Sequence, residues 1–267
     1  MRYQILGGLN VVSDDSRGND EQSGEQVTED VSSLGARKVQ TVLAALLIRS
    51  NQVVSSDQLL RELWGDSPPR RATAGLHVYI SQLRKYLTTV QPGRSPLITR
   101  APGYLIELGN DDLDLLVFRR LVREGRTRMR AGRHEEASAS FWSALELIRG
   151  PILSDLDEGE IVGRFGTWAE EARRECVELL VECDFILGRH RELIGFLYDL
   201  VYEQPLREVF YHQLMLALYR SDRRADALRV YTTARETLTR ELGLEPCRAL
   251  RELHQAILVG DETRLAG

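Results

Sequence analysis

The segment 72–87 constrains the fold of this chain more than any other part of the sequence. Its large apolar residues recur at intervals of four, three and four positions, at Leu76, Ile80, Leu83 and Leu87. This spacing predicts an amphipathic helix with one stripe facing a core. The segment contains no acidic residue, and its opposite face carries an apolar side chain, Val78. An ordinary solvated face carries more Glu and Lys, so we expect this face to contact another molecule.

Two further helices are predicted before this segment. Residues 37–49 place apolar side chains at helical spacing. The next helix begins after Ser55, because Gln58 follows three residues later in a capping-box arrangement, and it ends at Trp64 and Gly65. A loop with two prolines and two arginines then leads into the helix 72–87.

Hairpins flank these three predicted helices. Residues 3–6 and 9–12, joined by two glycines, predict a first hairpin. Residues 97–100 and 104–108, joined by Ala-Pro-Gly, predict a second with Arg100 and Tyr104 near its tip. Short strands, three helices and a terminal hairpin predict an α+β winged helix-turn-helix over residues 1–109. Within it, residues 13–33 are predicted to form a flexible acidic insertion, because they contain few apolar residues.

The distribution of charge indicates a nucleic acid partner that the net charge conceals. The whole chain has a net charge of -5. Residues 35–109 nevertheless carry ten basic against four acidic side chains, whereas residues 110–267 carry 23 basic against 29 acidic ones. A basic module beside an acidic one is typical of a protein that contacts DNA with the first and proteins with the second.

The outer face of the helix 72–87 suits the major groove of DNA. There Gln82 can bond adenine and Val78 can meet a thymine methyl group. Arg70 and Arg71 precede the helix, where the helix dipole disfavours cations unless a phosphate lies nearby; the alternative is that both are ordinary solvated arginines. The predicted DNA-binding residues are Arg70, Arg71, His77, Val78, Ser81, Gln82, Arg84, Lys85, Thr99, Arg100 and Tyr104.

The second half, residues 110–267, is predicted to be an all-α domain of tetratricopeptide-like repeats. Three similar turns begin near Gly132, Gly188 and Asp222, and the last two are 34 residues apart, which is the tetratricopeptide period. Such repeats leave a concave surface for partners. The predicted helix pairs are 113–130 with 135–149, 168–187 with 191–201, and 208–219 with 225–240, followed by a last helix at 247–258.

The sequence offers no pattern for catalysis, a cofactor or a metal. The three cysteines form no CxxC pair, the histidines have no metal-ligand spacing, and neither a phosphate-binding glycine-rich loop nor a GxSxG motif occurs. The longest apolar run, residues 42–48, is far shorter than the ~20 residues of a membrane span. We therefore expect a cytoplasmic protein with no catalytic residue, no cofactor and no membrane partner.

Two stretches resemble known families. LHVYISQLRKYL followed by ITRAPGYLIEL resembles the recognition helix and wing of OmpR/PhoB-type DNA-binding domains. LMLALYRSDRRADALRVY and the later ELGLEP resemble a bacterial transcriptional activation domain. Their order is that of the Streptomyces antibiotic regulatory protein (SARP) family. The resemblance implies DNA contacts from Val78, Gln82 and Arg84 on the helix and from Thr99, Arg100 and Tyr104 on the wing. Gln82 stands where relatives often have Arg, so the base preference does not carry over.

The resemblance also implies partners. These are double-stranded promoter DNA with tandem direct repeats, a second copy of the chain on that DNA, and RNA polymerase with its sigma factor. The polymerase contact would come from the loop that contains Trp64, Gly65 and Asp66, and the regulated genes would form an antibiotic biosynthetic cluster. The alternative is a protein–protein interaction scaffold or signalling adaptor built on the tetratricopeptide-like repeats, with a non-essential DNA-binding module.

Overall fold

The computed structural model describes residues 1–12, 36–156 and 159–260, so the predicted acidic insertion 13–33 lies outside the described residues. The chain divides into two compact units, which are described separately. The first contains Met1–Arg126 and Ser140–Val177, and the second contains Thr127–Ala139 and Glu178–Gly267. The division of the sequence into domains at residue 110 stays a prediction.

Three helices of the first unit pack against one another. They are α1 (Arg37–Ile48), α2 (Ser56–Trp64) and α3 (Ala72–Val90). The predicted stripe of α3 is buried, with Leu76, Ile80, Leu83 and Leu87 each at most 2% exposed. The capping box of α2 is confirmed, because Ser55 and Gln58 each accept a hydrogen bond from the other's backbone amide. These helices form the predicted three-helix segment.

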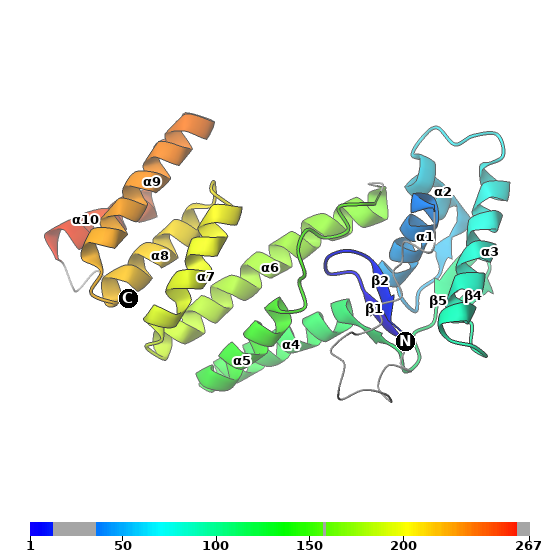
Figure 1. The fold of residues 1–267 in the computed structure, drawn as a ribbon, viewed down its shortest axis with the longest axis horizontal. Helices are drawn as coiled ribbons and strands as arrows, with labels where there is room; N and C mark the ends of the chain where they lie inside the picture. The colour runs from blue at the N-terminus through cyan, green and yellow to red at the C-terminus, as the bar shows by residue number, and fades with distance from the viewer. Residues whose placement is uncertain (13–35, 157–158, 261–267) are drawn as a thin grey trace, which may run out of the picture. The chain divides into compact units, whose positions relative to one another are not determined.

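Two small sheets complete the winged helix (Figure 1). Both predicted hairpins are confirmed, and each gains a short strand that was not predicted. The first sheet has the order β2 (Asn10–Val12), β1 (Arg2–Gln4) and β6 (Asp112–Leu113); the second has the order β3 (Val54–Ser55), β5 (Gly103–Ile106) and β4 (Leu97–Arg100). Gly103 is required where β5 meets β3, since a Cβ there would lie 1.9 Å from the Val54 carbonyl oxygen.

Three helices contribute residues to both units. They are α4 (Asp114–Arg130), α5 (His134–Leu145) and α6 (Glu160–Ile186). The predicted start of α6 at Trp168 was wrong, because the helix begins eight residues earlier. Gly163 and Gly166 lie in this first part and are weak helix formers, so the local sequence does not favour a helix there.

The remaining helices belong to the second unit. They are α7 (His190–Glu203), α8 (Glu208–Arg220), α9 (Arg224–Leu242) and α10 (Arg248–Val259). Helix α8 contacts α7, α9 and α10, and it buries six side chains, including Phe210 and Tyr211. Helix α9 is capped by Gly243, whose positive φ of 68° places it in the left-handed conformation directly after the helix. The predicted helical second half is confirmed, with bounds within a few residues for these four helices.

Candidate nucleic-acid interface

The face of α3 opposite its buried stripe is open to solvent. Val78 is 52% exposed on this face. His77, Ser81, Gln82 and Lys85 are exposed beside it. The helix thus presents one apolar and several hydrogen-bonding side chains and contains no acidic residue, a combination that suits contacts with base edges in the major groove.

The wing lies beside this helix (Figure 1). Thr99 and Arg100 are exposed on β4, and Arg84 of α3 donates a hydrogen bond to the Thr99 hydroxyl. Two residues that the sequence suggests as separate DNA contacts are thus joined to each other. Tyr104 differs from the other predicted residues, because it is only 7% exposed within β5. A DNA contact at Tyr104 can involve only the small accessible part of its side chain.

Arg70 and Arg71 are both exposed at the start of α3. The first turn of α3 contains no acidic residue, and Arg71, at the N-cap position, makes no capping hydrogen bond with its side chain in the described structure. The amides at a helix start and two nearby guanidinium groups together favour an anion, so this end of α3 fits a DNA phosphate.

The loop that follows α2 is held at its beginning by contacts from two other helices. The Trp64 ring stacks on Tyr79 of α3, with ring centroids 6.1 Å apart. Lys38 of α1 places its ammonium 4.5 Å from the centre of the Trp64 ring and donates a 2.9 Å hydrogen bond to the Leu63 carbonyl. Gly65 and Asp66 are exposed beyond this anchor. Sequence reasoning missed Lys38, since its partner lies 25 residues away.

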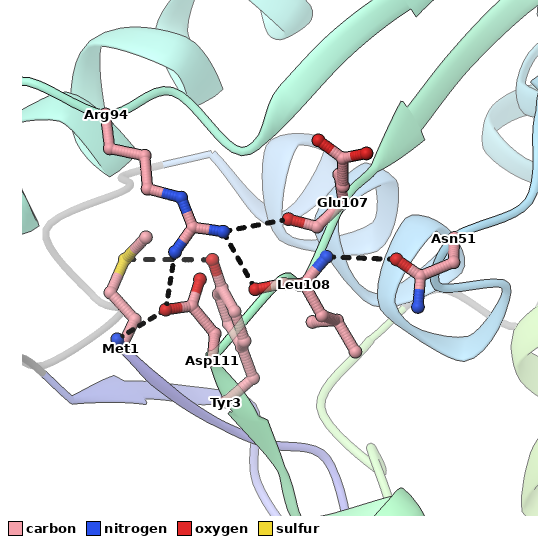
Figure 2. A network of polar contacts seen from close by, with 7 residues as sticks. All are labelled: Met1, Tyr3, Asn51, Arg94, Glu107, Leu108 and Asp111. Atoms are coloured by element: carbon pink, nitrogen blue, oxygen red, sulfur yellow. Dashed lines mark hydrogen bonds and ion pairs between the residues drawn. The ribbon is translucent and has the colours of Figure 1, made fainter.

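A polar network holds the base of the wing (Figure 2). Asp111 accepts hydrogen bonds from the Met1 amine at 2.8 Å and from Arg94 at 3.0 Å. Arg94 also donates to the Leu108 carbonyl at 2.8 Å, and Asn51 accepts from the Leu108 amide at 3.0 Å. The segment after β5 is thereby fixed both to Met1, directly before β1, and to the turn that follows α1. Sequence reasoning had counted Arg94 only as part of the basic charge.

Two buried carboxylates accept hydrogen bonds from backbone amides elsewhere in the first unit. Glu62 of α2 accepts from Ile161 at 2.7 Å and from Val162 at 2.9 Å, at the start of α6. Asp114 at the start of α4 accepts from Ile5 and Leu6 at 3.0 Å and forms an ion pair with Arg149 at 2.7 Å. Both acids are less than 5% exposed, so they connect segments rather than bind a partner.

Other kinds of site find no support in the part of the chain that the structure describes. Within it, no three His, Cys, Asp or Glu side chains are grouped so as to hold a metal ion. None of the described helices is both long and apolar enough to cross a membrane.

Two family models match the chain. The model for a bacterial transcriptional activator domain matches residues 113–258. The model for the C-terminal part of transcriptional regulatory proteins matches residues 33–106, which include α1, α2, α3 and the wing. The regulatory-protein model precedes the activator-domain model along the chain, in the order that the sequence predicts.

Several regulatory proteins are similar to this chain in sequence. The regulatory protein DnrI of Streptomyces peucetius is 37% identical over 85% of each chain. The transcriptional regulator RedD of Streptomyces coelicolor is 37% identical over 85% of this chain and 65% of its own length. The transcriptional regulatory protein EmbR of Mycobacterium tuberculosis is 37% identical, and the match covers 58% of its length.

A solved structure is similar as well. Mycobacterium tuberculosis EmbR, in complex with a low affinity phosphopeptide, superposes with a TM-score of 0.80 at 32% identity, over 97% of this chain and 65% of that one. The two family models match the winged helix and the helical second half, and the similar proteins are transcriptional regulators. The chain therefore belongs to the SARP family of transcriptional regulators.

Proposed function

We propose that this regulator is a sequence-specific DNA-binding activator without catalytic function or cofactor. The observation that carries this proposal is the outer face of α3, which is exposed, free of acidic residues and centred near Val78 at 52% exposure. The relatives DnrI and RedD are named as regulatory proteins, and both come from Streptomyces species. We therefore propose an antibiotic or other secondary-metabolite gene cluster as the target, and a cytoplasmic location.

The proposed binding mode follows from the positions of the side chains. Helix α3 enters the major groove, where the Gln82 amide forms two hydrogen bonds with adenine and Val78 packs on a thymine methyl group. Arg70 and Arg71 contact phosphates and set the register of the helix on the duplex. Arg100 extends from the wing toward the adjacent minor groove. The hydrogen bond between Arg84 and Thr99 fixes the wing relative to the helix, so both elements meet the DNA together.

RNA polymerase and its sigma factor are the proposed protein partners of the loop Trp64, Gly65 and Asp66. The stacking of Trp64 on Tyr79 and the contact with Lys38 support this role, because they hold the start of the loop while the residues beyond it stay accessible. A preorganised loop loses less conformational entropy when it binds. We propose self-association on direct repeats for the helical second half.

Footprinting of the full chain across the promoters that flank its own gene tests the proposal. We expect protection of tandem repeats and an affinity that falls steeply with salt, because several phosphate contacts release counterions. The matched control is the same fragment with the repeats scrambled, which should retain only weak non-specific binding. Absence of any protection on these promoters at low salt would contradict the activator function and favour the scaffold alternative.

A further inference from the structure

A groove in the second unit takes no part in the proposed DNA-binding function. Its volume is about 720 Å³, and it is lined by residues of α7, α8 and α9 and by the α7–α8 connection. We call it the α9 groove and define it by six of its lining residues, which are Tyr198, Tyr202, Tyr211, Leu214, Arg229 and Thr233. The volume falls within the range of small-molecule sites, roughly 300–1,000 Å³.

The floor of the α9 groove is apolar and fixed. Tyr211 and Leu214 of α8 are 1% and 0% exposed. The Tyr211 hydroxyl donates a 3.0 Å hydrogen bond to the Pro205 carbonyl, so the ring is oriented and its polar group is satisfied. The floor therefore offers ring and methyl surface with no hydrogen-bonding demand.

The rim of the α9 groove is aromatic. Tyr198 is 40% exposed and Tyr202 is 88% exposed, the highest value among the exposed large hydrophobic side chains of the described chain. Tyrosine rings pack favourably against other aromatic rings in offset-stacked or edge-to-face arrangements. Two exposed tyrosines above a buried apolar floor favour a flat aromatic ligand.

One end of the α9 groove carries an excess of positive charge. Arg223 and Arg229 both donate hydrogen bonds to one carboxylate, Asp226. These hydrogen bonds, first from Arg229 and then from Arg223, lower the pKa of Asp226, which is therefore ionised at neutral pH. Two guanidinium groups against one carboxylate leave one surplus positive charge among the lining residues. The positive end of the α9 dipole adds to it.

We propose that the α9 groove binds a flat aromatic small molecule with a single anionic group, such as an aromatic carboxylic acid. The rings lie between the tyrosine rim and the accessible apolar surface of Val230, which is 7% exposed, and the anion meets the N–H groups of Arg229 that Asp226 does not use. This site lies on the helical domain and is independent of the proposed DNA contacts. It gives the regulator a binding site for a metabolite.

The site can be tested on the full chain with two dyes of nearly equal shape. 8-Anilinonaphthalene-1-sulfonate carries one negative charge, and N-phenyl-1-naphthylamine is its neutral analogue. Fluorescence titration should show one saturable site for each dye, with tighter binding of the sulfonate. The charge preference follows from the surplus arginine, and the binding of both dyes follows from the rings.

Two adjacent threonines of α9 supply a matched pair of variants. Thr232 and Thr233 are both exposed, and each donates a hydrogen bond to the carbonyl four residues earlier. Of the two, only Thr233 lines the groove. Thr233→Trp should fill the groove and abolish saturable binding of both dyes, whereas Thr232→Trp should leave it unchanged. Binding that survives Thr233→Trp would overturn the proposal, because the dye would then occupy another surface.

The charge preference has its own variants. Arg229→Gln should lower the affinity for the sulfonate dye about tenfold, which corresponds to the loss of one charge-assisted hydrogen bond. The affinity for the neutral dye should not change. Arg235→Gln removes the same charge from α9 at a position that does not line the groove, and it should change neither dye. An equal loss for both dyes in Arg229→Gln would overturn the anionic preference. If the unmodified chain is a dimer that binds neither dye, and Thr233→Trp dissociates this dimer, then a second copy of the chain occupies the groove. That result would overturn the proposal of a small-molecule ligand.

Discussion

The Glu62 carboxylate accepts a 2.7 Å hydrogen bond from the backbone amide of Ile161, 99 residues further along the chain. Glu62 lies within the region matched by the regulatory-protein model, and Ile161 lies within the activator-domain model. The carboxylate is 3% exposed, and a Cβ at Gly159 would lie 2.3 Å from its Cδ atom. One buried acid of the winged helix thus serves as the N-terminal cap of the longest helix in the described chain.

Replacement of Glu62 should destabilise the protein. Glu62→Ala leaves the first amides of α6 buried without an acceptor, and we expect a loss of about 1–3 kcal/mol in the free energy of unfolding. Urea denaturation of the full chain, monitored by circular dichroism, measures this loss of stability. Glu160→Gln is the control, because Glu160 lies at the same helix start and forms an exposed ion pair with Arg164. This variant should change the free energy of unfolding by less than about 0.5 kcal/mol. Equal effects of the two variants would contradict the capping role.

Base recognition by α3 can be separated from general affinity for DNA. Gln82→Ala and Val78→Ala should each cost about 1–3 kcal/mol on the specific site and leave non-specific binding unchanged. Both side chains are exposed, so the fold should not change. Electrophoretic shifts on specific and scrambled duplexes make the comparison. Thr89→Ala, an exposed position near the end of α3, is the control. The same loss on every duplex would mean that these residues do not read bases.

The two arginines before α3 should behave in the opposite way. Arg70→Ala or Arg71→Ala should weaken binding to all duplexes alike, since a phosphate contact carries no sequence information. The slope of log affinity against log salt should fall by about 0.9 for each phosphate that the variant no longer neutralises. Arg191→Ala, an exposed arginine of α7, is the matched control and should keep the full slope. An unchanged slope in the Arg70 and Arg71 variants would place both side chains in solvent.

Features set by nearby residues were predictable from the sequence. The α3 stripe, the Ser55–Gln58 capping box and the turns between the later helices each depend on spacings of a few residues. For the same reason the exposed face of α3 could be predicted from the sequence. The strand β3 could not, because two residues show no alternation.

Features that depend on distant partners could not be predicted. From the sequence, Glu62 would be predicted to be a surface acid on a charged helix. Its burial is explained only by its hydrogen bond with Ile161, 99 residues away. Asp114 is similar, since the amides it binds lie 108 and 109 residues earlier. The early start of α6 has the same origin, because the cap is supplied by another segment while its first turns contain two glycines. The sequence predicts Tyr104 near the tip of the wing, but the side chain of this β5 residue is buried.

The three thiols should differ in reactivity. Burial raises the pKa of Cys176 to about 12 and that of Cys183 to about 11, so almost no thiolate forms at pH 8 and reagents cannot reach either sulfur. Cys247 is exposed, although partial burial of its thiol raises its pKa too. Ellman's reagent should therefore modify one thiol in the native protein and three in denaturant. Cys247→Ser should remove the native reaction and Cys176→Ser should not; two reactive thiols in the native chain would contradict the packing of α6.

The loop after α2 gives a prediction that separates activation from DNA binding. Asp66→Ala removes an exposed side chain beyond the Trp64 anchor, so DNA affinity and stability should stay within about twofold and 0.5 kcal/mol of the unmodified chain. If the loop contacts RNA polymerase, the yield of transcripts from a purified system should fall severalfold. Asp57→Ala, an exposed acid in the first turn of α2, is the control for loss of one negative charge. A matching drop in DNA affinity would assign Asp66 to the DNA interface, and unchanged transcription would remove this loop from the polymerase contact.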